Sequence, residues 1–332
     1  MHIPDGFING ATSAGAAVVA AGAVGAALRK SGQELQRRMV PMAGLVAAFI
    51  FALQMLNFPV AAGTSGHLLG GALAAVLLGP SMGLLAVTVV VVLQALVFAD
   101  GGISALGLNV LNMAVVTSLV GWGAFIGSMA ILRKRTSSVV VASFVAAAIS
   151  VIASSIAFAF EYAIGGQGGA PVGTVFTAVA GVHTLIGLGE GLITAATVAA
   201  VLVVRPDLVF GARRYELETS IQVSRRGAVA GFVASGLAAA VLLVVFVAPF
   251  ANPNPDGLES TAEQEGFIDT AADNSVGGPL AGYGVTGIDS ATVGTVLAGV
   301  VGVLLTFLVG LLVFRLFSRV DQSRLDRSPG PP

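Results

Sequence analysis

Residues 291–314 read ATVGTVLAGVVGVLLTFLVGLLVF and contain no charged side chain. A run of this length can cross the hydrocarbon core of a bilayer, which takes roughly 20 apolar residues in a helix. Comparable stretches recur at about 11–28, 39–60, 67–79, 82–99, 108–132, 138–160, 183–204 and 228–250. We therefore predict an all-α, polytopic membrane helical bundle of about seven helices, some short or broken, followed by a two-helix C-terminal module.

The overall composition agrees with a membrane class. The 332 residues are 56% hydrophobic and only 10% charged, and the mean hydropathy is +0.94. Stretch 67–79 is too short to span alone, so we expect a half-helix surrounded by protein. No basic segment precedes the first apolar run, so we do not expect a secretory signal peptide.

The basic residues predict the orientation. All 16 Lys and Arg fall in segments 29–38, 133–135, 205–226 and 315–327, which nine apolar stretches would put on one side of the membrane. The positive-inside rule makes that side cytoplasmic. We therefore expect a multi-pass protein of a prokaryotic plasma membrane, with an extracytoplasmic N-terminus and a cytoplasmic C-terminus.

One loop is strongly acidic. Residues 251–290 contain seven carboxylates and no basic side chain. On the outer face such a loop would attract cations by long-range steering. The alternative is a solvated, partly disordered loop without a specific site. The two interpretations are compatible.

The start of the chain offers ligands for a metal ion. Residues 1–6 read MHIPDG. The amine of Met1, the amide nitrogen of His2 and an imidazole nitrogen of His2 can close two chelate rings in one plane. Planar nitrogen coordination suits Ni(II) or Cu(II), and by extension low-spin Co(II), better than Mg(II). A frayed chain end without any ligand is the alternative.

The sequence contains three histidines, His2, His67 and His183, and no cysteine. A metal site must therefore use nitrogen or oxygen ligands. His67 follows the small-residue turn 63–66 on the same predicted side as the N-terminus, so it is our candidate for a fourth nitrogen. The alternative is an inert, hydrogen-bonded histidine at a helix start.

Five further residues are candidates for lining the pocket or supporting its ligands. His183 and Glu190 are seven residues apart and thus share one helical face. Ionisable residues inside a membrane are functional candidates, although a structural hydrogen bond or ion pair would also explain them. The five residues are Asp5, Ser65, Asn109, His183 and Glu190.

Several other activities lack their sequence signals. Neither Lys30 nor Lys134 follows a glycine, so the lysine of a Walker A loop is missing and ATP hydrolysis would need another subunit. We find no Ser-His-Asp arrangement and no paired carboxylates at a shared site. The basic segments are explained by orientation or partner docking, and we expect no nucleic-acid partner and no prosthetic group.

With these residues in hand, the chain resembles the CbiM/NikM family, the substrate-capture (S) components of energy-coupling factor (ECF) transporters for cobalt and nickel. The tail resembles the PDGLE-type, CbiN/NikN-like small component through residues 255–259. The matching stretches in the first part are 1–7, 54–60, 63–70, 100–102, 109–113 and 183–194.

The resemblance implies that Met1, His2 and His67 bind the ion in a pocket that the N-terminal segment plugs. It also implies a membrane T component (CbiQ/NikQ-like) and ABC ATPases (CbiO/NikO-like) as partners in the bilayer. We expect a metal-capture domain at 1–205, a cytoplasmic linker at 206–226 and a PDGLE-like two-helix domain at 227–332, with the acidic loop 251–290.

The residues do not separate cobalt from nickel as the transported ion. Two other functions remain open from the sequence. One is a metal-dependent intramembrane enzyme that uses His67, His183 and Glu190, which would need an open coordination position for water. The other is a passive metal channel or sensor. A pump subunit differs from a channel in depending on a partner ATPase.

Overall fold

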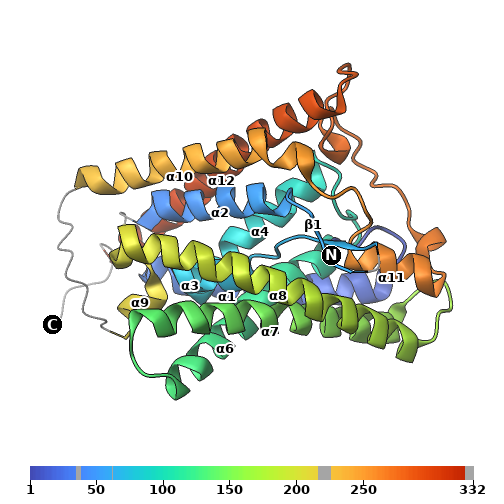
Figure 1. Cartoon of the computed structure of the whole chain (residues 1–332), viewed down its shortest axis with the longest axis horizontal. Coiled ribbons are helices and arrows are strands. Elements are labelled where there is room, and N and C mark those ends of the chain that lie inside the picture. Colours follow the sequence, from blue (N-terminus) through green and yellow to red (C-terminus); the bar gives the residue numbers. More distant parts are fainter. Residues whose placement is uncertain (35–38, 62, 216–225, 326–332) are drawn as a thin grey trace.

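The computed structural model describes residues 1–34, 39–61, 63–215 and 226–325 (Figure 1). Within these ranges, seven helices are long and apolar enough to cross a membrane. They confirm the predicted all-α polytopic bundle. Their spans are 10–31, 80–97, 106–131, 136–165, 172–204, 229–250 and 291–316.

The long helices form the frame of the molecule. They are α1 (Gly10–Glu34), α4 (Pro80–Val97), α7 (Thr136–Gly165), α8 (Val172–Val204), α10 (Arg226–Phe246) and α12 (Ala291–Leu325). A further span is composite, because α5 (Leu106–Asn109) runs through the π-helical turns η2 (Val110–Val116) into α6 (Thr117–Ile131). Pro80 at the first turn of α4 and Pro171 just before α8 suit helix starts, where the missing N–H is not needed.

Two helices are too short to span. Helix α2 (Val40–Gln54) has 15 residues and α3 (Gly71–Leu78) has eight. Every residue of α3 is buried, as expected for a half-helix surrounded by protein. The apolar stretch expected to continue to residue 60 leaves the helix at Gln54 and pairs in a small antiparallel ladder, β1 (Phe58–Pro59) with β2 (Ser65–Gly66).

One predicted loop is wrong. The predicted apolar stretches 138–160 and 183–204 leave an outer loop near 161–182 between them, but α7 continues to Gly165 and α8 already begins at Val172. The connection is therefore only 166–171, which reads GQGGAP. Helices can extend past the apolar core of the bilayer, so the end of an apolar run does not mark the end of a helix.

The two C-terminal helices pack along α2 on one side of the molecule, while α7 and α8 lie together on the other (Figure 1). Small residues allow this close approach. A Cβ atom on Gly310 would lie 3.2 Å from the Cα of Gly44, and one on Gly302 would lie 2.1 Å from the Phe51 ring. Small residues are the usual means of close helix packing in lipid. The C-terminal module is thus packed against the first part of the chain through α2.

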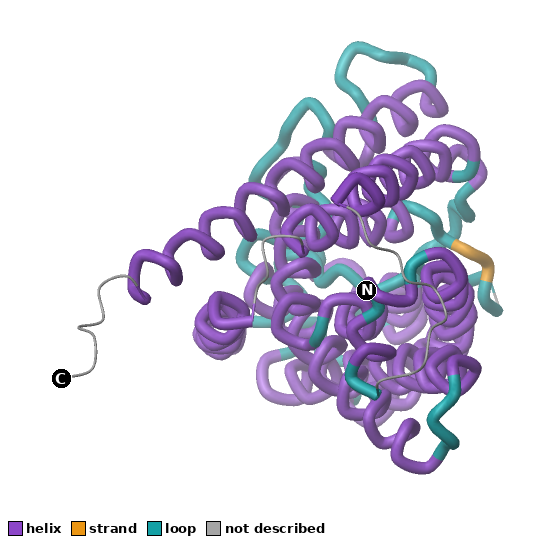
Figure 2. The backbone as a smooth tube through the Cα atoms, turned by 90° about the vertical axis from the view of Figure 1, so that its left-hand side faces the viewer, coloured by secondary structure: helices purple, strands orange, loops and turns teal. Residues whose placement is uncertain are grey.

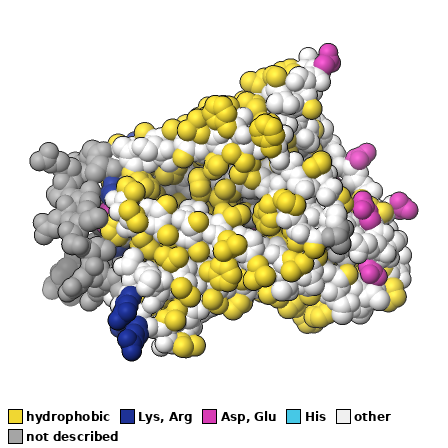
Figure 3. Space-filling view, viewed as in Figure 1, with side chains coloured by type: hydrophobic (Ala, Val, Ile, Leu, Met, Phe, Trp, Pro, Cys, Tyr) yellow, Lys and Arg dark blue, Asp and Glu magenta, His cyan; other side chains and the backbone are white. Residues whose placement is uncertain are grey.

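The acidic loop is partly folded. It contains helix α11 (Gly257–Glu265), whose N-terminus has a capping box made by Asp256 and Glu259. Short helical turns η5 (Ile268–Thr270) and η6 (Ala281–Tyr283) follow. In Figure 3, acidic side chains gather at the end of the molecule where α11 lies, and Lys and Arg at the opposite end.

Three short elements remain. Two of them, η3 (Pro206–Leu208) and α9 (Phe210–Arg213), follow α8 at the end with the basic residues. The third, η4 (Ala248–Phe250), follows α10 at the opposite end. Of the linker expected at 206–226, residues 216–225 lie outside the described residues. The start of the chain lies within the outline of the bundle in two perpendicular views (Figures 1 and 2).

Candidate metal site

The N-terminal segment is buried in the bundle. Met1 is 2% exposed, and Ile3 and Phe7 are fully buried. Asn109 holds the segment on both sides of Ile3: its Oδ1 accepts from the Ile3 N–H at 2.7 Å, and its Nδ2 donates to the Ile3 carbonyl at 3.0 Å. Asn109 therefore anchors the chain end and lies one residue away from the ligand candidates.

Asp5 ties the same segment to the loop before α5. Its carboxylate accepts hydrogen bonds from the backbone N–H groups of Ile103 at 3.1 Å and Ser104 at 2.7 Å. The hydroxyl of Ser104 donates a further bond at 2.6 Å. Asp5 thus closes the N-terminal bend.

The amine of Met1 lies between a histidine and a carboxylate. Its nitrogen is 2.6 Å from Nε2 of His67, and it forms an ion pair with Oδ2 of Asp256. Nδ1 of His67 donates to the carbonyl of Leu68 at 3.1 Å, so the lone pair of Nε2 accepts from the amine. Nε2 also lies 3.5 Å from Oδ2 of Asp256. A hydrogen bond from the other ring nitrogen is the usual way in which a protein orients a ligating imidazole.

This spacing suits a metal ion. With metal–nitrogen bonds of about 2.0 Å, neighbouring nitrogens of a square site lie about 2.8 Å apart. The distance of 2.6 Å between the Met1 nitrogen and His67 Nε2 is close to that edge. The ammonium group therefore occupies a position from which its nitrogen could share an ion with His67.

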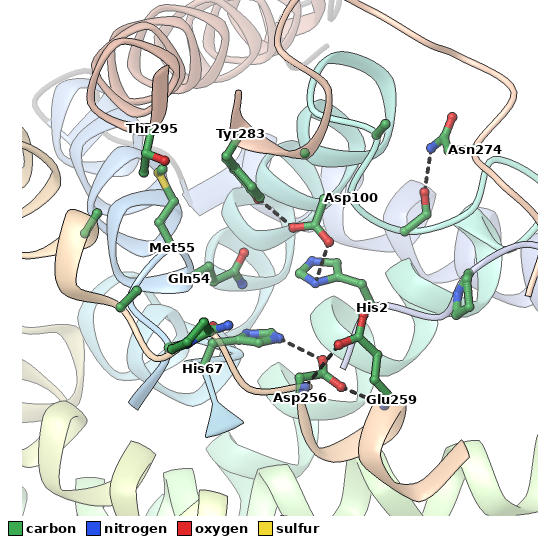
Figure 4. Close-up of a pocket in the computed structure, with 18 of the residues that line it drawn as sticks. His2, Gln54, Met55, His67, Asp100, Asp256, Glu259, Asn274, Tyr283 and Thr295 are labelled. Carbon is green, nitrogen blue, oxygen red and sulfur yellow. Dashed lines mark hydrogen bonds and ion pairs between the residues drawn. The ribbon is translucent and has the colours of Figure 1, made fainter. Parts of the chain in front are cut away.

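The His2 ring lies beside the His67 ring, but its two nitrogens contact other residues. The two rings stack with centroids 5.1 Å apart (Figure 4). Nδ1 of His2 is 3.1 Å from Asp100, and Nε2 is 3.1 Å from Oε1 of Gln94. Burial lowers the pKa of His2 to about 4, so its ring is neutral at pH 7, the form that binds metals. To chelate an ion together with the Met1 amine, the ring must exchange these partners for the ion.

Asp256 is the site residue that sequence reasoning missed. We assigned it to the acidic loop and to the PDGLE-like stretch 255–259, not to the metal site, yet it contacts the amine of residue 1 across 255 positions of sequence. Its other oxygen, Oδ1, caps α11 by accepting from Leu258 N at 2.7 Å and Glu259 N at 2.9 Å. Burial opposes ionisation of Asp256, but the Met1 ammonium beside it holds the pKa well below its usual range. An Asp followed three residues later by Glu predicts a helix start, but nothing in that pattern names the partner.

Glu190 and Gln54 hold the turn that carries His67. The buried carboxylate of Glu190 accepts from Leu69 N at 2.6 Å and Gly70 N at 3.0 Å, at the N-terminus of α3. Nε2 of Gln54 donates to the Leu69 carbonyl at 2.9 Å. Glu190 therefore binds backbone next to His67 and does not reach the ligand nitrogens.

The two remaining candidates contact the C-terminal module. Ser65 donates its hydroxyl to the Asn254 carbonyl at 2.8 Å. His183 shares a small enclosed pocket with Met1, His67 and Asp256. Its Nδ1 donates to Val179 O at 2.8 Å, while its Nε2 has no hydrogen-bond partner. His183 is thus close to the amine, and within the described residues no hydrogen bond joins it to His2 or His67.

Side chains alone do not form a metal cluster here. Across the described ranges, no three His, Cys, Asp or Glu side chains lie close enough together to hold an ion. A site at this position would therefore need the terminal amine and the backbone nitrogen of His2 as well as the imidazoles. Such a nitrogen-rich, oxygen-poor set is typical of Ni(II) or Cu(II).

Two parts of the chain match known protein families. Residues 2–208 match the family described as the cobalt uptake substrate-specific transmembrane region, CbiM, and residues 230–319 match the PDGLE domain. The chain is 35% identical over 316 residues to a putative fused nickel transport protein NikMN of Archaeoglobus fulgidus, covering 95% of this chain and 98% of that protein.

Other relatives cover the first part alone. A putative metal transport protein of Haloquadratum walsbyi is 42% identical over 210 residues, covering 63% of this chain and 94% of its own length. A truncated transition metal transporter of known crystal structure aligns with a TM-score of 0.53 and 29% identity, covering 61% of this chain and 99% of that one. The chain therefore belongs to the CbiM family of cobalt uptake transmembrane proteins and carries a PDGLE domain in the same polypeptide.

Proposed function

We propose that this protein is the substrate-capture subunit of an ATP-driven ECF-type transporter that imports Co(II) or Ni(II). The observation that carries the proposal is the buried Met1 amine, 2.6 Å from Nε2 of His67. Family membership and the transport names of its relatives support the same class of function. Relatives carry names for both nickel and cobalt transport, so both ions remain substrates in the proposal.

In the proposed mechanism, the ion replaces the charge of the Met1 ammonium. The amine releases a proton when its lone pair binds the ion, as metal ligands generally do. Asp256, now the partner of the ammonium, then faces the positive charge of the metal instead. The amide nitrogen of His2 also gives up its proton when it binds, and both protons pass to the water that leaves the ion. These two backbone nitrogens, an imidazole nitrogen of His2 and Nε2 of His67 would complete a planar set.

Selectivity in this mechanism comes from geometry and access. The Irving–Williams order makes Cu(II) the strongest binder of a nitrogen site, so affinity alone does not select nickel or cobalt. A buried planar set disfavours ions that prefer oxygen ligands and octahedral or larger coordination spheres. Zn(II), which prefers tetrahedral ligands, is disfavoured by the same geometry.

The energy for transport would come from separate subunits. The sequence has no Walker A lysine, so we propose partner ABC ATPases, CbiO/NikO-like, coupled through a membrane T component, CbiQ/NikQ-like. The proposed orientation puts the pocket and α11 on the extracytoplasmic side and the described Lys and Arg side chains on the cytoplasmic side. The separation of charge between the two ends of the molecule supports it.

The N-terminus provides the sharpest test. One residue added before Met1 converts the amine to an amide and has no room, because Met1 is 2% exposed. We expect nickel and cobalt binding, measured by calorimetry on purified protein, to fall below detection. The matched control is the same protein made as a cleavable fusion whose removal restores the amine of Met1. Equal affinity before and after cleavage would refute the amine as a ligand.

A second experiment separates the pump subunit from a channel or an enzyme. Uptake of radioactive nickel into cells should require co-expression of the ATPases and T component, and should be lost when the ATPase catalytic site is inactivated. Uptake that persists with the inactive ATPase would favour a channel. Metal binding without any dependence of uptake on the chain would favour an enzyme.

A further inference from the structure

A cavity of about 800 Å³ opens beside the candidate nitrogen set (Figure 4). We call this cavity the vestibule. The first part of the chain contributes His2, Gln54 and Asp100 to its wall, and the PDGLE part contributes Glu259 and Tyr283. The vestibule thus lies where the two family segments meet, next to the buried Met1 amine.

One residue of the vestibule wall, Gln54, has a side-chain oxygen without a hydrogen-bond partner. Gln54 is 4% exposed and ends helix α2. Its Nε2 is fixed by the Leu69 carbonyl at 2.9 Å, so its Oε1 is directed away from that carbonyl, and this oxygen has no partner. Figure 4 shows the Gln54 side chain between His67 and Asp100 on the wall of the vestibule. A buried acceptor without a partner is unfavourable, so this oxygen calls for a hydrogen-bond donor.

Apart from histidine, the charged side chains that line the vestibule are all carboxylates, and its neutral polar side chains are Asn, Gln, Thr and Tyr. Asp100 and Glu259 bring carboxylates, and none of the described residues that line the cavity is a Lys or Arg. The hydroxyl of Tyr283 is already committed, since it donates to Asp100 at 2.5 Å. The vestibule therefore presents negative charge and acceptor oxygens to an occupant that must be cationic and rich in hydrogen-bond donors.

A bare metal ion does not meet this description. No three acidic or histidine side chains within the described part of the chain are close enough to ligate one ion directly. A divalent cation with its water shell does meet it, because the six bound waters point their hydrogens outward. Six waters occupy about 180 Å³ at their liquid volume, so the cavity of about 800 Å³ accommodates the hydrated ion.

We propose that the vestibule is a separate, outer-sphere binding site for the hydrated divalent cation, in which Gln54 Oε1, Asp100 and Glu259 accept hydrogen bonds from its water ligands. The site holds the ion next to the nitrogen set before water is removed. It rests on the proposed function for the identity of the ion, but its ligands are different residues and its chemistry is different, since no metal–protein bond forms.

Hexaamminecobalt(III) tests the proposal directly. Its ammonia ligands do not exchange, so it cannot enter the nitrogen set, yet its outward N–H groups imitate those of a hydrated ion. We expect calorimetry on the full-length protein in detergent to show one bound complex per chain. Gln54→Met, which keeps the side-chain length, should weaken binding about tenfold because it removes a hydrogen-bond acceptor for a charged ligand. Asp100→Asn should weaken binding by a similar factor, about tenfold, because it removes a negative charge beside the cation.

Glu263→Gln is the matched control. Glu263 is exposed on the same helix as Glu259 and does not line the vestibule, so we expect unchanged binding. Size-exclusion profiles and unfolding temperatures verify that each variant is folded. Absence of binding to the wild type would overturn the vestibule site. So would equal affinity in the wild type and both vestibule variants, or an equal loss in the Glu263 control.

The readouts keep this proposal apart from the proposed function. Nickel affinity is measured in the same preparations without the cobalt complex. Nickel binding without hexaamminecobalt binding would leave the capture function standing and overturn the vestibule. Hexaamminecobalt binding that depends on Gln54 and Asp100, in a protein that does not bind nickel, would support the vestibule and overturn the nitrogen site.

Discussion

Glu190→Gln should weaken nickel binding although Glu190 does not reach the ligand nitrogens. Both carboxylate oxygens accept backbone hydrogen bonds, from Leu69 N at 2.6 Å and Gly70 N at 3.0 Å, and the side chain is fully buried. Glutamine has one acceptor oxygen, so its NH₂ group must face a backbone N–H. The variant loses one hydrogen bond and leaves a buried donor unpaired, at a cost of about 2–3 kcal/mol.

The cost falls on the turn that holds His67. If it lowers the population of the binding-competent turn, the apparent dissociation constant rises in proportion. A free energy of about 2 kcal/mol corresponds to about 30-fold, so we expect nickel affinity to fall by about 10- to 30-fold. The assay is calorimetry on protein with an unmodified N-terminus, together with the unfolding temperature in the same detergent.

Glu161→Gln is the control for a buried glutamate. Glu161 lies in α7, where it accepts from Asn112 Nδ2 at 2.7 Å and makes no bond to the His67 turn. We expect its nickel affinity to stay within about threefold of the wild type, even where stability falls. Wild-type nickel affinity in Glu190→Gln would refute the reasoning that Glu190 positions His67.

Three further substitutions test other parts of the structure. Asp256→Asn keeps a good helix N-cap but removes the counter-charge of the Met1 amine, so calorimetry should show nickel binding weakened at least about tenfold because a charge beside the cation is lost. Asp5→Ala removes the clamp on the N-terminal bend, so an aminopeptidase should digest the chain end faster, and an unchanged rate would contradict a clamping role. Gly71→Ala would bring a Cβ within 1.8 Å of Thr117 Oγ1, which should lower the unfolding temperature through overpacking by about 1–3 kcal/mol.

Much of the fold could be predicted from the sequence because the bilayer requires a minimum length of consecutive apolar residues in each spanning helix. A spanning helix needs about 20 apolar residues whatever its neighbours are, so stretches such as 291–314 can be recognised as spanning helices from the sequence alone. The eight-residue α3 was also predictable as a half-helix. Helix ends outside the apolar core carry no such signal, which is why the expected loop 161–182 proved to be mostly helix.

The ligand hypothesis also came from local sequence. Met1 and His2 are adjacent, and the chelating atoms of a chain end are defined by covalent bonds alone. The structure brings the amine of Met1 next to His67, while metal binding by Met1, His2 and His67 stays a prediction. The present contacts of His2 with Asp100 and Gln94 were not predictable, since they depend on how α4 and the following loop pack.

The sequence by itself determined the class of protein and most of the helical spans, and it pointed to a candidate set of nitrogen ligands at its start. Only the tertiary structure decided which groups surround those ligands. Asp256 meets the Met1 amine, and the PDGLE part closes the vestibule, because α10 and α12 pack along α2 and carry the acidic loop over the end of the bundle. Hydropathy records how apolar a segment is, whereas the pairing of segments depends on the shape and small residues of the packed surfaces.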